Sequence, residues 1–182
     1  DRAGRALTRT SQSGLVTTYT YGYTEAGNEL ITQTLPSGAT IITEKYLDGK
    51  TKSVTGTGIT AQYYYYGVNA DGSQWTKVTT GASETTAVAW SKTTTNAFGR
   101  TIKSERTGVN GSVIISEYTY TSKGQLVKIT TKDNQNNTIS AATIYEYDEL
   151  GNIIRSGQDI NNDGVLTLAS MDRISESITS ML

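Results

Sequence analysis

The fold of this chain is decided by the stretch Tyr145-Glu146-Tyr147-Asp148-Glu149-Leu150-Gly151-Asn152-Ile153-Ile154. Tyr145 and Tyr147 fall on one face of a strand, because successive side chains of a β-strand point to opposite faces. Polar residues then lead to Gly151, and an apolar strand follows from Ile153. Glycine is the residue that tight hairpin turns favour. The stretch therefore predicts a β-hairpin with its turn at Gly151.

Variants of this turn recur along the whole chain. The pattern is an aromatic residue or Asn, then two or three mostly polar residues, Gly, a polar residue and an apolar one, and the first copy, from Asp1, is cut off at its start. The glycines are Gly4, Gly27, Gly49, Gly72, Gly99, Gly124 and Gly151, with successive spacings of 23, 22, 23, 27, 25 and 27 residues. Three positions after the glycine stand Leu7, Leu30, Lys52, Trp75, Ile102, Val127 and Ile154, of which only Lys52 breaks the apolar pattern. A period this steady indicates a repeat architecture.

A second group of turn residues lies between successive repeat glycines. The sequence therefore predicts two strands and two turns in each repeat. These candidates are Ser13-Gly14, Ser37-Gly38, Gly56-Thr57-Gly58, Gly81, Asn110-Gly111 and residues 133–137. A lone hairpin is marginally stable in water, whereas stacked hairpins share one sheet. We therefore expect an all-β fold, an antiparallel sheet of stacked β-hairpin repeats forming a single array over residues 1–182. The one helical turn that we expect is short and lies near Ala169 to Met171.

Composition excludes several classes of protein. The 182 residues contain 16 Lys and Arg against 17 Asp and Glu, so the formal net charge is −1 and nucleic acid is not an expected partner. No apolar run approaches the ~18 residues of a membrane span. The regular strand pattern argues against the alternative of a Thr- and Ser-rich disordered linker. The chain begins at Asp1 without a signal peptide, and we expect it to be a piece of a longer protein.

Residues Tyr145 to Ile154 resemble the YD-repeat signature of Rhs proteins, wall-associated toxins, insecticidal toxin complex subunits and teneurins. The other copies are degenerate, although Ala3-Gly4-Arg5 and Phe98-Gly99-Arg100 keep a Gly-Arg variant of the signature. The resemblance extends over nearly the whole chain.

The resemblance implies a spiralling β-sheet that closes into a hollow shell around a toxin or effector, or that builds an extracellular scaffold. This chain would be an arc of such a shell in a large secreted or cell-surface bacterial protein. Its partners would be the rest of the array and its cargo, and open edge strands also favour edge-to-edge self-association. Family members that release cargo carry a self-cleavage segment Asp-Pro-x-Gly, whereas the single proline here is Pro36, followed by Ser37.

The clearest chemical motif lies in the loop at residues 157–172. Oxygen-bearing side chains alternate and then meet Gly164, as at the start of an EF-hand-like calcium loop. The predicted Ca²⁺ ligands are Asp159, Asn161, Asp163, the Val165 carbonyl, Thr167 and Asp172. Ser170 stands where an EF-hand has its bidentate Glu. The motif thus predicts a structural calcium site, and the alternative is an Asn- and Asp-rich turn without metal.

The chain offers little for catalysis. It contains no His and no Cys, which excludes Ser-His-Asp and Cys-His triads, histidine bases and thiolate metal sites. Paired carboxylates are still chemically open, but the acidic residues fall in predicted turns or on polar strand faces, where they are solvated. We therefore expect that the chain is not an enzyme.

The aromatic residues suggest an alternative function. Residues 63–66 are four consecutive tyrosines, which places two rings on each face of a strand. Tyr64, Tyr66, Trp75 and Trp90 are the candidates for stacking against sugar rings, which would make the chain a carbohydrate- or cell-surface-binding module. The other interpretation, which we favour, is that these rings form the shared layer of the stacked hairpins.

Overall fold

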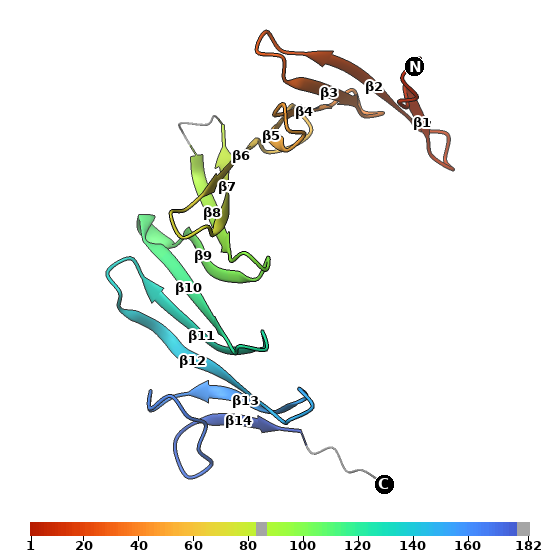
Figure 1. The fold of residues 1–182 in the computed structure, drawn as a ribbon. Coiled ribbons are helices and arrows are strands. Elements are labelled where there is room, and N and C mark those ends of the chain that lie inside the picture. The colour runs from red at the N-terminus through yellow and green to blue at the C-terminus, as the bar shows by residue number, and fades with distance from the viewer. Residues whose placement is uncertain (83–86, 178–182) are drawn as a thin grey trace. The chain divides into compact units, whose positions relative to one another are not determined.

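The computed structural model describes residues 1–82 and 87–177. Over these residues the chain is all-β, with fourteen strands joined in one antiparallel sheet, which confirms the predicted fold class. Each strand is hydrogen-bonded to the strands before and after it in the sequence, so that the spatial order is the chain order (Figure 1). Short connections explain this order, because a tight turn can only return the chain antiparallel to the strand just completed.

In chain order the strands are β1 (Thr8–Thr10), β2 (Val16–Tyr23), β3 (Glu29–Thr34), β4 (Thr40–Lys45), β5 (Thr51–Thr55), β6 (Gln62–Val68), β7 (Gln74–Gly81), β8 (Ala87–Thr95), β9 (Thr101–Thr107), β10 (Val113–Tyr120), β11 (Leu126–Asp133), β12 (Thr138–Tyr147), β13 (Ile153–Asp159) and β14 (Arg173–Glu176). A single 3₁₀ turn, Val109–Gly111, is the described helical segment. It contains the predicted Asn110-Gly111 pair, and both residues have positive φ, 53° and 76°. The stretch expected to be helical, Ala169 to Met171, instead forms a hydrogen-bonded turn.

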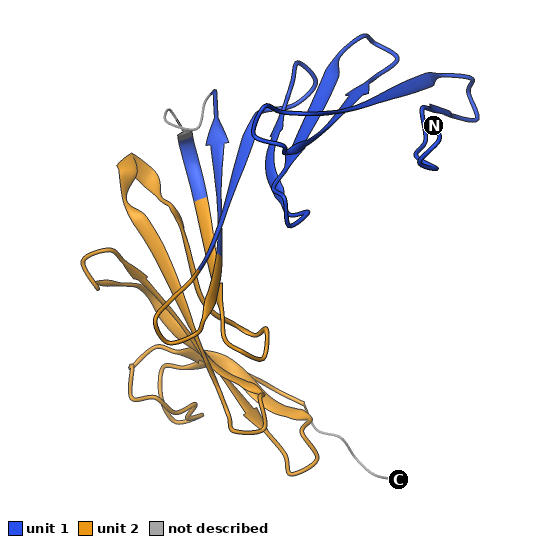
Figure 2. Cartoon of the chain, turned by 45° about the horizontal axis from the view of Figure 1, so that its top comes forward, with its two compact units in different colours: residues 1–67, 76–90 blue, residues 68–75, 91–182 orange. Residues whose placement is uncertain are grey.

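The chain divides into two compact units (Figure 2). Unit 1 comprises Asp1–Gly67 and Thr76–Trp90, and unit 2 comprises Val68–Trp75 and Ser91–Leu182. The boundary falls within β6, β7 and β8, so it does not coincide with the start of a repeat.

The two faces of the sheet in unit 2 differ in chemistry. Cross-strand pairing places a largely uncharged set on a single face, which we call the tyrosine face of unit 2: Ser104, Ile114, Ser116, Tyr118, Tyr120, Ile129, Thr131, Thr143, Tyr145, Tyr147 and Ser156. Three charged residues lie on it too, because Arg106 and Asp133 pair with Ile114 and Arg173 pairs with Gln158. The opposite face alternates in charge, with Lys103, Glu105, Glu117, Lys132, Glu146, Arg155 and Glu176. Four ion pairs of 2.8–3.3 Å run along this ion-pair face. Each is partly exposed and contributes roughly 0–1 kcal/mol, so the pairs set register more than stability.

Unit 1 has a tyrosine face of its own. Its residues are Thr17, Tyr19, Tyr21, Ile31, Gln33, Ile41, Thr43, Val54, Gln62, Tyr64 and Tyr66. Pairing of Ser53 with Tyr63, and of Val54 with Gln62, fixes the direction of the tyrosine run. Tyr64 and Tyr66 therefore share the face of Gln62, and Tyr63 and Tyr65 lie on the other face.

Very little of the described chain is buried. Its buried apolar side chains are Ala142, Ile144 and Leu166, all in unit 2. The chain exposes 12058 Å², whereas a compact protein of 19.6 kDa exposes about 8,600 Å². This excess of exposed surface is what a single-layer sheet produces, since most side chains have neighbours beside them but none above them.

Replacing Gly49 by Ala tests whether a repeat turn requires a residue that adopts positive φ without strain. Gly49 has a φ of +84° and open space where a β-carbon would project, so the change introduces strain without a clash. We expect the free energy of unfolding to fall by about 1 kcal/mol, measured by urea denaturation. Gly22→Ala is the matched control, because Gly22 also has open space but lies in a strand at ordinary φ. An equal effect of the two substitutions would contradict the turn requirement.

Candidate functional site

All seven repeat glycines occupy turns of one geometry. The glycine N–H donates to the carbonyl three residues earlier, over 2.9–3.1 Å, in every copy from Gly4 to Gly151. The glycines have φ between +74° and +90°, the left-handed region that costs a side-chain-bearing residue energy. The first residue of each turn then donates its own N–H to the carbonyl of the residue after the glycine. This five-residue unit is the structural repeat.

A side-chain oxygen completes each turn by accepting the N–H of the residue after the glycine. In five turns the acceptor is the first turn residue, namely Asp1, Thr24, Asn96, Thr121 or Asp148. In the other two it is the third, Asp48 or Asp71. Asp, Asn and Thr offer the same acceptor, which explains why the sequence of the turn is degenerate while its geometry is constant.

Hydrogen bonding to these acidic groups favours their charged form. The Asn152 side-chain amide, followed by the Asn152 N–H, lowers the pKa of Asp148 below its usual range. The Ser73 hydroxyl does the same to the pKa of Asp71, and the Lys50 N–H to the pKa of Asp48. The carboxylates therefore serve the turns as ionised acceptors.

Four tyrosines each bind one of the seven turns to the next strand. The hydroxyls of Tyr21, Tyr66, Tyr120 and Tyr147 donate to backbone carbonyls over 2.7–2.9 Å. Every acceptor lies two residues after a repeat glycine, at Ala6, Thr51, Thr101 and Leu126. We call this contact the tyrosine lock. Thr95 makes a longer version of 3.4 Å to Gln74, which also lies two residues after its glycine.

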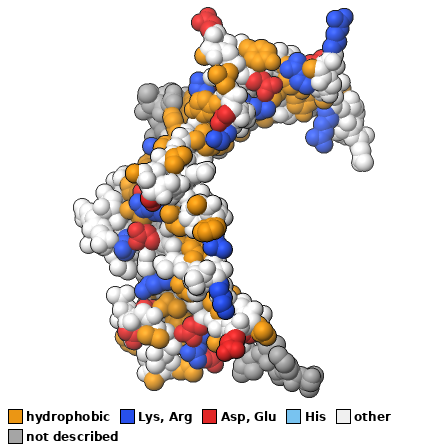
Figure 3. Space-filling view, in the orientation of Figure 1, with side chains coloured by type: hydrophobic (Ala, Val, Ile, Leu, Met, Phe, Trp, Pro, Cys, Tyr) orange, Lys and Arg blue, Asp and Glu red, His pale blue; other side chains and the backbone are white. Residues whose placement is uncertain are grey.

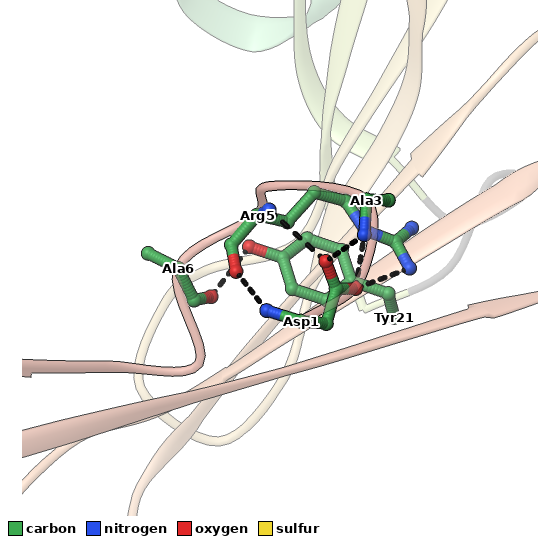
Figure 4. A network of polar contacts seen from close by, with 5 residues as sticks. All are labelled: Asp1, Ala3, Arg5, Ala6 and Tyr21. Carbon is green, nitrogen blue, oxygen red and sulfur yellow. Dashed lines mark hydrogen bonds and ion pairs between the residues drawn. The ribbon is translucent and has the colours of Figure 1, made fainter.

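A cation covers the ring in three of the locks. Arg5, Lys50 and Arg100 each follow a repeat glycine directly, and they lie over Tyr21, Tyr66 and Tyr120 at 4.2, 5.3 and 6.0 Å from the ring centre. Figure 4 shows the first of these locks, in which the side chain of Arg5 lies beside the Tyr21 ring while Asp1 accepts from Arg5. A cation–π contact contributes about 0.5–1 kcal/mol at an exposed site.

Four β-bulges accompany the turns. The pairing register shifts just before the turn at Lys45, Thr95, Tyr120 and Tyr147. In each case the unpaired residue on the partner strand is the one three positions after the glycine: Lys52, Ile102, Val127 or Ile154. The position that the sequence marks as apolar is thus a bulge residue in these four repeats.

The predicted calcium loop is a closed, hydrogen-bonded structure between β13 and β14. Asp159 accepts from the N–H groups of Asp163 and Gly164 over 3.1 and 2.9 Å. Asn161 donates its amide to Asp163 over 2.7 Å, and the Val165 N–H donates to the same carboxylate over 2.9 Å. Gly164 has a φ of +87°, which permits the bend.

The second half of the loop closes on Asp172. Its carboxylate accepts from the N–H groups of Ile160 and Thr167 over 2.9 and 3.0 Å. The pKa of Asp172 is lowered, first by the Thr167 N–H and next by the Ser170 hydroxyl. Leu166 fastens the loop to the sheet: it is 2% exposed, and a β-carbon on Gly157 would lie 3.1 Å from its side chain.

The loop therefore brings the predicted ligands Asp159, Asn161 and Asp163 together, with Asp172 joined to the same loop through its backbone contacts. The Asp159 side chain is buried within the loop, since the residue is only 1% exposed. Among the described residues no three acidic side chains gather as a metal-binding cluster, so a bound Ca²⁺ would need the Asn161 amide oxygen and backbone carbonyls such as that of Val165. Calcium binding stays a prediction.

The four candidate sugar-stacking rings are half-buried and already have contacts. Tyr66 meets Tyr46 edge-on with ring centres 6.1 Å apart, and the Tyr64 hydroxyl donates to Gln62. In unit 1 the Lys77 ammonium lies 5.1 Å from the centre of the Trp90 ring. In unit 2 Lys92 lies 4.8 Å from Trp75. The two lysines lie over tryptophan ring faces that a sugar would need, and binding by this set stays a prediction.

The tyrosine lock is the feature that inspection of the sequence missed. Tyr21 and Tyr66 lie three residues before the first residue of their turns, whereas Tyr120 and Tyr147 lie one residue before it. A fixed-spacing motif does not capture both placements. The signal that could have found them is the strand alternation, which puts all four rings on tyrosine-rich faces.

No family model matches the chain, and no curated protein matches it. Among solved structures, the chain is similar to one in the crystal structure of TcdB2-TccC3-TEV, with 18% sequence identity and a TM-score of 0.30. The match covers 87% of this chain and 11% of that one, so the residues here span about a ninth of the neighbour's length.

Removing the Tyr147 hydroxyl tests the lock. Tyr147→Phe keeps the ring and deletes the bond to Leu126, so we expect unfolding free energy to fall by about 1 kcal/mol and hydrogen exchange to quicken at the start of β11. Tyr145→Phe is the control, since the Tyr145 hydroxyl on the same strand and face has no partner among the described residues. If both variants matched the parent in unfolding free energy and hydrogen exchange, the tyrosine lock would not stabilise the sheet.

Titration with Ca²⁺ tests the loop. Isothermal calorimetry on the whole chain is expected to show one saturable site with a dissociation constant of about 10⁻⁴–10⁻³ M, the range of extracellular calcium modules. Asp163→Ala should abolish the binding, and Asp71→Ala, in the repeat turn of Gly72, should leave it unchanged. Absence of binding heat, or equal losses in both variants, would reject the calcium site.

Proposed function

We propose that this chain is a structural wall segment of a large secreted or cell-surface bacterial protein of the Rhs/YD-repeat kind, part of a shell that encloses a toxin or effector. Its role is to form a continuous single-layer sheet and not to catalyse a reaction. The observation that carries the proposal is the repetition of one turn, seven times, with the same backbone hydrogen bonds.

The single-layer construction supports a wall. Among the described residues of unit 2 every strand belongs to the one sheet, and the loop held by Leu166 lies against β13. Charged side chains of both signs are interspersed over the visible surface in Figure 3 and do not gather into one patch. A sheet with two chemically different faces suits a wall, because a wall meets solvent on one side and cargo on the other.

The strand order supports continuation of the array. Hairpins follow one another without crossovers, so that a further repeat added before β1 or after β14 would extend the same sheet. The partners of this segment would then be neighbouring repeats of the parent chain and the enclosed cargo. Among the described residues no helix is long and apolar enough to cross a membrane.

The two faces give the proposal a direct test in the full-length parent protein. Ser116 and Glu117 are neighbours on β10 but belong to opposite faces. Single cysteines at these positions, in a parent freed of other cysteines, are treated with a small maleimide and with a large polyethylene-glycol maleimide. A closed wall is expected to let the large reagent reach one of the two positions only.

The 182-residue chain alone is the control, and in it both cysteines should react with both reagents. If the large reagent labelled both positions equally in the parent, the segment would not be the wall of a closed shell. Circular dichroism of each variant confirms that the substitution leaves the sheet intact.

A further inference from the structure

Each tyrosine face carries a hollow of the same composition. In unit 1 a hollow of about 760 Å³ is lined by Arg9, Leu15, Thr17, Tyr19, Gln33 and Pro36, with small polar residues of the 10–13 turn at its rim. In unit 2 a hollow of about 500 Å³ is lined by Thr143, Tyr145, Ser156, Gln158, Arg173 and Ser175. Both volumes lie within the range of small-ligand sites, about 300–1,000 Å³. Each contains one arginine, one tyrosine and at least one glutamine, with Ser and Thr hydroxyls.

The tyrosines in the hollows are those that the locks do not use. Tyr19 stands two residues before Tyr21, and Tyr145 two residues before Tyr147, on the same strand and face. Among the described residues, the hydroxyls of Tyr19 and Tyr145 have no protein partner. The structure thus leaves these two hydroxyls and rings available to another molecule.

The polar groups around Tyr19 are equally uncommitted. Cross-strand pairing of Arg9 with Thr17, and of Tyr19 with Gln33, puts their side chains on one face. Over the part of the chain that the structure describes, neither the Arg9 guanidinium nor the Gln33 amide has an ion pair or hydrogen bond within the protein. By contrast Arg5, four residues earlier, is paired with Asp1.

The charge of the lining selects the class of ligand. The unit 1 hollow has one cation, Arg9, and no acidic residue. A guanidinium without a carboxylate partner favours a carboxylate on the ligand, which it can bind through two parallel hydrogen bonds. The hydroxyls and the amide suit a ligand rich in hydroxyl groups, and Tyr19, Leu15 and Pro36 supply the apolar surface that the C–H face of a sugar ring needs.

We propose that the hollow at Arg9 and Tyr19 binds an acidic sugar, a hydroxylated ring that carries a carboxylate, as found in uronic-acid-containing glycans. The hollow at Arg173 and Tyr145 is a second site of the same kind in unit 2. The proposal is independent of the shell and uses neither of the tryptophans. The two proposed sites do not involve Tyr64, Tyr66, Trp75 or Trp90.

The experiment uses the 182-residue chain and three probes, observed by ligand- and protein-detected NMR titration. Methyl glucuronide carries both ring and carboxylate, methyl glucoside carries the ring without the charge, and acetate carries the charge without the ring. Methyl glucuronide is expected to bind in the millimolar range, with shifts at Arg9, Tyr19 and Gln33, and about tenfold more tightly than either other probe.

Substitutions assign the site. Arg9→Gln should weaken glucuronide binding at the first site about tenfold and leave methyl glucoside unchanged, because only the charged contact is lost. Arg2→Gln removes the same charge from an exposed position outside the hollow, and it should change the affinity by less than about twofold. Arg173→Gln should affect only the shifts around Tyr145.

Three results would overturn the proposal. They are the absence of saturable glucuronide binding, equal affinity for glucuronide and glucoside, and equal loss of binding in the Arg9→Gln and Arg2→Gln variants. The last would show attraction to overall charge and not to a built site. Failure here leaves the shell proposal untouched, because the cysteine-labelling experiment does not involve a ligand.

Discussion

The hydrogen-bonded glycine turn is the constraint on which the rest of the structure depends. Each turn returns the chain after five residues and satisfies the N–H of the first residue, of the glycine and of the residue after it. Such a turn fixes the register of the two strands that it joins, and a register error of one residue would move every side chain to the opposite face. Seven turns of the same geometry therefore propagate two faces of distinct chemistry along the chain.

The tyrosine lock adds coupling from one repeat to the next. A cation follows the glycine in the first, third and fifth repeats, at Arg5, Lys50 and Arg100, and these cations cover lock tyrosines from the following repeat. The glycines of those repeats are separated by 45 and 50 residues. In the sixth repeat Gln125 stands in place of the cation, and the lock of Tyr147 persists without it. The hydroxyl-to-carbonyl bond is thus the general element, and the cation is an addition made at alternate repeats.

Much of this architecture could be predicted from the sequence, because period and alternation are local properties. The glycine spacing located every repeat turn, and the strand alternation assigned Tyr145 and Tyr147 to one face. The bulges at Lys52, Ile102, Val127 and Ile154 could not be predicted, since an unpaired residue is defined only once its partner strand is known. The calcium-type loop was visible as a motif, but its attachment through Leu166 depends on the small residue Gly157 in a neighbouring strand.

The scarcity of buried apolar residues determines where stability comes from. A sheet with three buried apolar side chains among its described residues cannot rely on a core, so each strand depends on its ladder and on side-chain contacts with its two neighbours. End strands have one neighbour only, and β1 and β14, with 3 and 4 residues, are the shortest strands described. Short edge strands offer few unpaired N–H and C=O groups to another chain. The predicted self-association through β1 or β14 would therefore form few hydrogen bonds per contact. A further repeat of the same chain would pair with these edges more strongly, because a covalently linked strand loses no translational entropy on pairing.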